Sequence, residues 1–147
     1  MTTDLNSAIV RIRTKQGMIM GAGFLVDEGK ILTCAHVVRD ALGLKSTENK
    51  PAEPVHIDFP FIPDMPIQQA IVAVWKPSDK HGGDIAGLEL VAPLPKAVKP
   101  VRLVTLDRFW ERTFRAFGFP KRRSDGRWAE GKMLDVRPKG WVQLELS

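Results

Sequence analysis

Two residues suited to proton transfer stand at the ends of apolar segments of the sequence. His36 follows the short segment 30–33, and Asp84 opens the segment 85–91. An imidazole has an ordinary pKa near neutrality, so it can accept and return a proton under physiological conditions. A carboxylate that accepts a hydrogen bond from an imidazole holds the ring in one tautomer. The types of these two residues therefore allow general acid and base chemistry.

Each of these residues also has a simpler interpretation. A histidine at the end of a strand can be a buried residue whose nitrogens are satisfied by hydrogen bonds. Asp84 follows Gly82 and Gly83, and an aspartate in that position can cap a turn. The three histidines and Cys34 show neither C-x-x-C nor H-x-x-x-H spacing, so no zinc site is predicted.

Short segments rich in valine and isoleucine predict the strands that would position these residues. In the first segment Ala8, Val10 and Ile12 share one face. Gly21 and Gly23 interrupt the second, as in a strand that bends or that another backbone approaches closely. Strands are predicted at 7–14, 18–26, 30–33, 55–59, 67–75, 85–91, 101–106, 113–119, 133–137 and 141–146, and helices only at 35–44 and 106–112. Many short strands separated by glycine and proline turns indicate an all-β barrel or sandwich.

Length and composition exclude several classes of protein. The chain has 147 residues, of which 44% are hydrophobic and 27% charged, so it is neither a disordered chain, a collagen nor a coiled coil. A single cysteine excludes an internal disulfide framework. The sequence has neither an apolar run long enough for a membrane helix nor the features of a secretory signal at residues 1–7. A cytoplasmic protein is therefore expected.

The positive charge is concentrated in the last third of the chain. Residues 96–147 carry 13 Lys and Arg against 6 Asp and Glu, whereas residues 1–95 carry 9 against 11. A basic stretch can attract nucleic acid, anionic lipid or an acidic partner. The basic residues are scattered and no nucleic-acid motif accompanies them, so a solvated surface is the preferred interpretation. Neither nucleic acid nor a membrane is a predicted partner.

Three segments, in their order and spacing, resemble the trypsin-like (chymotrypsin-fold) serine peptidases. They are Thr33-Cys34-Ala35-His36-Val37-Val38, Gly83-Asp84-Ile85-Ala86 and Gly118-Phe119-Pro120. The similarity is to the bacterial, disulfide-free type and covers essentially the whole chain. It implies an all-β fold, with a six-stranded Greek-key barrel over residues 1–104 that carries His36 and Asp84. Residues 105–147 would then form the first strands of a second barrel, which leaves the chymotrypsin-like double barrel incomplete.

The resemblance also implies a role for each residue of the site. His36 would be the general base, and Asp84 would orient its ring. The nucleophilic serine of the family lies in a Gly-x-Ser-Gly context, which no serine of this chain has. The nucleophile is therefore expected outside this chain, and the chain alone is expected to be inactive. Cys34 suggests a thiol nucleophile, but its position in the family usually holds a small core residue, which is the preferred interpretation. The four tryptophans are expected to fill barrel cores and seal barrel ends.

The sequence thus predicts a serine endopeptidase domain that hydrolyses peptide bonds through an acyl-enzyme and uses no metal or organic cofactor. The expected partners are a protein or peptide substrate and either the remainder of the protease domain or attached signalling domains. The alternative is a non-catalytic, protease-like module that binds peptides or partner domains through its basic second half.

Overall fold

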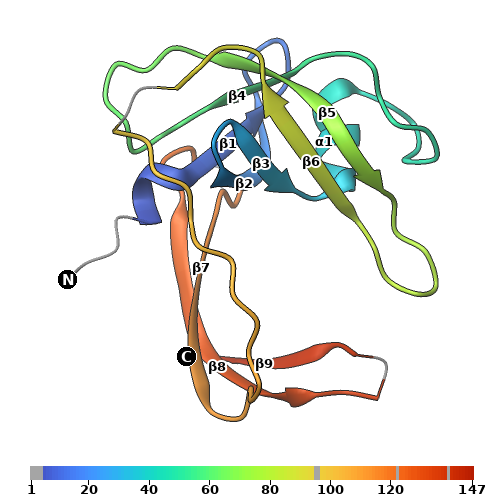
Figure 1. Cartoon of the computed structure of the whole chain (residues 1–147), viewed down its shortest axis with the longest axis vertical. Coiled ribbons are helices and arrows are strands. Elements are labelled where there is room, and N and C mark those ends of the chain that lie inside the picture. The colour runs from blue at the N-terminus through green and yellow to red at the C-terminus, as the bar shows by residue number, and fades with distance from the viewer. Residues whose placement is uncertain (1–4, 95–96, 122, 139) are drawn as a thin grey trace. The chain divides into compact units, whose positions relative to one another are not determined.

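The computed structural model describes residues 5–94, 97–121, 123–138 and 140–147, and the chain divides into two compact units. The first unit extends to Arg102, and the second begins at Leu103. The first is a closed barrel of antiparallel strands in the spatial order β1-β2-β3-β6-β5-β4 (Figure 1). A 3-10 helix, η1 (Leu5–Ala8), precedes β1 (Ile9–Arg13), β2 (Ile19–Asp27), β3 (Lys30–Thr33), β4 (Val55–Asp58), β5 (Gln68–Lys76) and β6 (Ile85–Leu90). The predicted all-β fold with a six-stranded barrel is confirmed.

Apolar side chains that alternate along the strands form the core of the barrel. Val10 and Ile12 on β1 are fully buried, as their alternation predicts, and Arg11 and Arg13 lie on the other face of the strand. The other strands contribute Leu25, Ile31, Val55, Ile57, Ala70, Val72, Ala86 and Leu88. Burial of a valine, leucine or isoleucine contributes about 1.5–3 kcal/mol relative to its exposure, so this core is the main stabilising element of the barrel.

An α-helix, α1 (Ala35–Leu42), follows β3 directly and packs on the barrel. Four of its eight residues are buried, and it ends at Gly43, which adopts the left-handed conformation common after helices. Gly21 on β2 allows the helix to approach closely, because a Cβ at that position would lie 2.7 Å from a methyl carbon of Val37. The helix predicted at 35–44 is confirmed, and it ends two residues earlier than predicted.

The second unit is a three-stranded antiparallel sheet, and its described residues form no apolar core. Its strands, β7 (Arg112–Gly118), β8 (Arg127–Val136) and β9 (Val142–Leu146), pair in that order. Among the described residues of this unit, only Gly131 is buried. The large apolar side chains exposed there are Leu103, Val104, Trp110, Trp128, Val136, Trp141, Leu144 and Leu146. The sheet therefore lacks the apolar burial that stabilises the barrel.

Two elements predicted near the start of the second unit do not form. No strand covers 101–106: Val101 donates a hydrogen bond to the carbonyl oxygen of Leu25 at 2.8 Å, but the following residues do not continue this pairing. No helix covers 106–112. In addition, β8 begins at Arg127 rather than at residue 133, because residues 127–132 pair with β7 across a hairpin.

The expectation that the tryptophans fill barrel interiors holds only for Trp75. Its ring packs partly buried against the barrel core, and its indole N–H donates to the carbonyl oxygen of Thr47 at 2.8 Å. Trp110, Trp128 and Trp141 are 63%, 41% and 68% exposed. The described part of the second unit is a single open sheet with flanking loops, so the unit itself offers these side chains no opposing layer to enter.

A charged cluster joins β1 to β4 on the outside of the barrel. Arg11 stands opposite Asp58 in the strand register and donates from Nε to Oδ1 at 2.9 Å. Arg13 donates from Nη2 to Oδ2 of the same carboxylate at 3.1 Å. Burial raises the pKa of Asp58, but the hydrogen bonds and positive charges of the two arginines outweigh this and hold it below its ordinary value.

We expect Asp58→Asn to lower the free energy of unfolding by about 2 kcal/mol near neutral pH, because hydrogen bonds to charged groups contribute about 1.5–3 kcal/mol. The depressed pKa makes this contribution complete above the unfolded carboxyl pKa of about 3.9, and the contribution disappears as the pH falls through the folded value. Urea unfolding of both proteins across this range measures the effect. If the loss of unfolding free energy in Asp58→Asn stayed constant down to the lowest pH, the ionised carboxylate of Asp58 would not be its source.

Candidate active site

His36 lies in the first turn of α1, where the helix needs an acceptor from elsewhere in the fold. Cys34, the residue before the helix, has extended backbone (φ −90°, ψ 145°), and its side chain makes no capping hydrogen bond. The first N–H groups of a helix have no partner within the helix. Donors at the start of α1 therefore stand next to the imidazole of His36.

Asp84 supplies that acceptor from the turn before β6. The pairing of β3 with β6 sets Thr33 opposite Ala86, so residues just after β3 lie beside residues just before β6. The backbone N–H of His36 donates to Oδ1 of Asp84 at 2.9 Å. Asp84 thus caps α1 although it is 48 residues away in sequence. Its negative charge suits the positive end of the helix dipole.

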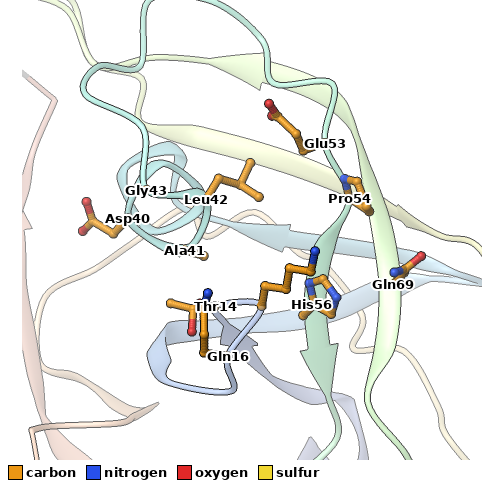
Figure 2. A pocket seen from close by; sticks show the side chains of 11 residues that line it. Thr14, Gln16, Asp40, Ala41, Leu42, Gly43, Glu53, Pro54, His56 and Gln69 are labelled. Carbon is orange, nitrogen blue, oxygen red and sulfur yellow. The ribbon is translucent and has the colours of Figure 1, made fainter.

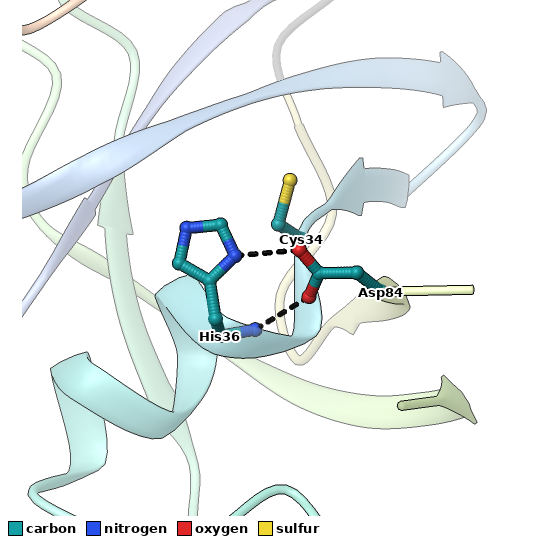
Figure 3. Close-up of side chains that lie close together, drawn as sticks. All are labelled: Cys34, His36 and Asp84. Carbon is teal, nitrogen blue, oxygen red and sulfur yellow. Dashed lines mark hydrogen bonds and ion pairs between the residues drawn. The ribbon is translucent and has the colours of Figure 1, made fainter. Parts of the chain in front are cut away.

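The same carboxylate holds the imidazole (Figure 3). Nδ1 of His36 lies 2.6 Å from Oδ2 of Asp84. Because an ionised carboxylate only accepts hydrogen bonds, the neutral ring carries its proton on Nδ1, and the lone pair of Nε2 faces away from Asp84. The side chain of His36 is 49% exposed, which leaves the ring accessible to a reacting group. The structure therefore brings together the two residues that the sequence singled out.

The carboxylate of Asp84 is ionised at neutral pH. Burial raises its pKa, but hydrogen bonds from the backbone and ring of His36, the charge of that ring and the N–H of Ala35 together lower it by more. The net result is a pKa below the ordinary aspartate value. The arrangement can therefore hold His36 in one tautomer and stabilise a positive charge on the ring when Nε2 takes up a proton.

The turn that directs Asp84 depends on Gly83, whose role the sequence analysis missed. Asp84 has φ of 66°, in the left-handed region that aspartate and asparagine tolerate better than most residues. Gly83 has φ of 103°, and a Cβ on it would lie 2.4 Å from the carbonyl oxygen of Pro77. The adjacent pair Gly82-Gly83 was the sequence signal for this constraint.

We expect Gly83→Ala to destabilise the chain by about 3 kcal/mol, because it adds a backbone collision to an unfavourable φ. Gly82→Ala is the matched control: Gly82 has φ of 115°, but a Cβ there meets nothing within 4 Å. The control should lose only about 1–2 kcal/mol from the backbone conformation. Urea unfolding measures the loss of stability in both variants. Equal losses would contradict the predicted collision between a Cβ at residue 83 and the carbonyl oxygen of Pro77.

Cys34 lies between β3 and α1, close to both members of the pair. It packs against the barrel core, as predicted, and is half-buried. Burial raises the pKa of the thiol, and the negative charge of Asp84 raises it further. The thiol is therefore protonated at neutral pH, which disfavours it as a nucleophile because the thiolate is the reactive form.

The serines lie in several parts of the fold. Ser7 is buried before β1, and Ser46 and Ser78 lie in loops of the first unit. Ser124 and Ser147 belong to the second unit. None of the five has the Gly-x-Ser-Gly context.

A cavity of about 540 Å³ opens on the first unit (Figure 2). It is lined by Thr14, Lys15, Gln16, Asp40, Ala41, Leu42, Gly43, Glu53, Pro54, His56 and Gln69. The lining comes from the C-terminal end of α1, the loop after β1, and strands β4 and β5. Neither His36 nor Asp84 belongs to it, so this cavity is separate from the pair.

The sequence matches one protein family. Residues 3–137 match the family model described as Trypsin. A search of the curated proteins found no match. Among the described residues, no helix has the length and apolar character that a membrane crossing requires.

Three solved structures illustrate the structural similarity. The inactive form of the Rv3671c protease from M. tuberculosis H37Rv is 19% identical, with a TM-score of 0.57 over 90% of this chain and 54% of that one. Kallikrein-related peptidase 10 is 15% identical, with a TM-score of 0.65 over 99% of this chain and 72% of that one. Deg5 is 17% identical, with a TM-score of 0.63 over 97% and 69%. The chain thus spans about half the length of the Rv3671c chains that it matches.

Proposed function

This chain belongs to the trypsin family, and from that premise we propose that it provides the general base and the orienting carboxylate of a serine endopeptidase. The observation that carries the proposal is the 2.6 Å contact between Nδ1 of His36 and Oδ2 of Asp84. Its substrate would be a protein or a peptide.

In the proposed mechanism, Nε2 of His36 takes the proton of a serine hydroxyl as the oxygen attacks the scissile carbonyl carbon. The ring, now positively charged, gives the proton to the leaving amine, which produces an acyl-enzyme. Water then enters and loses a proton to the same nitrogen as its oxygen attacks the acyl carbon. The ring returns this proton to the serine oxygen, which leaves, so the acyl group is released as an acid and the serine hydroxyl is restored. Asp84 stays ionised throughout and holds the ring by Nδ1, which agrees with its lowered pKa.

We propose that the nucleophilic serine and the oxyanion hole come from polypeptide outside these 147 residues. No Gly-x-Ser-Gly occurs among them. The exposed apolar side chains on β8 and β9 support this proposal, because further strands of a second barrel would cover such a sheet. A bacterial, cytoplasmic setting belongs to the same proposal: the single cysteine leaves no pair for an internal disulfide, which suits a reducing compartment, and the bacterial origin rests on the resemblance alone.

We expect a fluorophosphonate probe, which reacts with activated serines, to leave the 147-residue chain unlabelled. The longer polypeptide that continues into a Gly-x-Ser-Gly segment should be labelled, and His36→Ala in it should abolish the labelling. His81→Ala, at an exposed loop histidine, is the matched control and should keep it.

Two outcomes would contradict the proposal. Rapid labelling of the 147-residue chain would place the nucleophile among its own serines. A longer polypeptide without the serine segment, or one that stays unlabelled, would favour the non-catalytic interaction module instead.

A further inference from the structure

A thiol, an imidazole and a carboxylate converge at the start of α1. In the described part of the chain, Cys34, His36 and Asp84 form a group whose ligand atoms all lie within 4.8 Å of one another (Figure 3). Sulfur, imidazole nitrogen and carboxylate oxygen are the ligand types of zinc. Spacing along the sequence gave no sign of this group, because Asp84 is 48 residues from His36.

We propose that Cys34, His36 and Asp84 bind a Zn²⁺ ion, which takes the place of the proton shared by His36 and Asp84. The three side chains leave one tetrahedral position for water. Thiolate and carboxylate together carry two negative charges, which balance the charge of the ion, and the imidazole binds as a neutral ligand.

Small side-chain movements are needed to form this site. Donor atoms around a tetrahedral zinc lie about 3.3–3.6 Å apart, given bonds of about 2.0–2.3 Å. Nδ1 of His36 and Oδ2 of Asp84 are closer than this, at 2.6 Å, so their hydrogen bond must open. The widest separations, up to 4.8 Å, must close by about 1 Å through side-chain rotation. The side chains of His36 and Asp84 are 49% and 30% exposed, so both have room to move toward the thiol of Cys34, which packs against the barrel core.

Binding of Zn²⁺ changes the positions of two protons. Cys34 loses its thiol proton to solvent when Sγ binds, since a coordinating thiol is deprotonated. The proton on Nδ1 of His36 moves to Nε2, because Nδ1 now donates its lone pair to the metal. One proton is released for each ion bound.

The functional consequence is inhibition, and this part rests on the proposed function. With zinc on Nδ1, Nε2 carries a proton and has no lone pair to accept another. The ring can then no longer act as the base toward a serine hydroxyl. Zinc would therefore hold the pair in an inactive state that removal of the metal reverses.

Cobalt titration of the reduced 147-residue chain tests binding without any need for activity. Tetrahedral Co²⁺ with a thiolate ligand gives a sulfur-to-metal charge-transfer band and visible absorption. Added Zn²⁺ should displace the bound Co²⁺ and remove both signals. Cys34→Ser should remove the charge-transfer band. His36→Ala and Asp84→Asn should each weaken Co²⁺ binding by about tenfold or more. His81→Ala and His56→Ala are controls and should leave the titration unchanged.

Either of two results would overturn the site. One is the absence of the charge-transfer band in the unaltered chain. The other is a band that keeps its affinity in both His36→Ala and Asp84→Asn, which would mean that the thiol binds the metal alone. Circular dichroism of each variant establishes that it is folded, and the three ligand variants test the site independently.

Inhibition is measured in the longer polypeptide as the ratio of peptidase activity with and without Zn²⁺. The unaltered protein should lose activity, and Cys34→Ser should need about tenfold more zinc for the same fractional loss. Equal sensitivity of the two would refute the inhibitory role. A polypeptide inactive even without zinc would refute the proposed peptidase, while the cobalt titration would still decide the metal site.

Discussion

Replacement of His36 by alanine is expected to lower kcat of the complete protease about 10⁶-fold, as loss of the base does in other serine proteases. The physical reason is that the serine hydroxyl keeps its proton at neutral pH unless a base removes it during attack. In the proposed mechanism the lone pair of Nε2 is the base, since Nδ1 is occupied by the contact with Asp84 at 2.6 Å.

The fold should survive this substitution. The side chain of His36 is 49% exposed, and alanine leaves intact the backbone N–H that donates to Asp84. Burst and steady-state kinetics with a peptide ester would measure the loss, with urea unfolding as the test of folding. His81→Ala serves as the matched histidine control and should keep full turnover. A folded His36→Ala variant within tenfold of the unaltered activity is incompatible with the assignment.

Asp84→Asn is expected to lower kcat about 10⁴-fold, as replacement of the triad aspartate by asparagine does in a well-characterised serine protease. Asparagine tolerates the left-handed backbone at this position, where φ is 66°, and its oxygen can still accept the N–H of His36. Its amide NH₂, however, donates to Nδ1 of the ring. The ring proton then moves to Nε2, and the base is lost although the fold is kept.

Two measurements check this substitution. Kinetics of the complete protease give the loss of turnover. In the 147-residue chain, proton NMR should show a far-downfield Nδ1–H resonance, because the hydrogen bond to a carboxylate is short, and Asp84→Asn should remove it. Asp79→Asn is the matched control, since Asp79 caps the neighbouring turn by accepting the N–H of His81 at 2.7 Å. If Asp79→Asn lowered kcat and removed the Nδ1–H resonance as much as Asp84→Asn, the effect would come from a disturbed loop and not from the contact between Asp84 and the ring.

The sequence by itself determined most of the barrel. Alternation placed Val10 and Ile12 in the core, and the small helix at 35–44 was apparent from its position after the third strand. These features depend on side-chain periodicity and turn residues within a few positions, which are local properties of the chain. The same reasoning failed at 101–106 and 106–112, where the local pattern allowed regular structure. Val101 contacts the barrel through its hydrogen bond to Leu25, but residues 102–111 form neither a strand nor a helix in the described part of the chain.

The sequence also singled out His36 and Asp84, but only the tertiary structure decided what they contact. The register of β3 against β6, with Thr33 opposite Ala86, brings together residues 48 positions apart. That register places one carboxylate on both the ring and the helix N-terminus, and sets Cys34 beside them. Strand pairing and barrel closure depend on the packing of the whole core, so no local pattern encodes them. For the same reason, the role of Gly83 became visible only when the carbonyl of Pro77 was found against it.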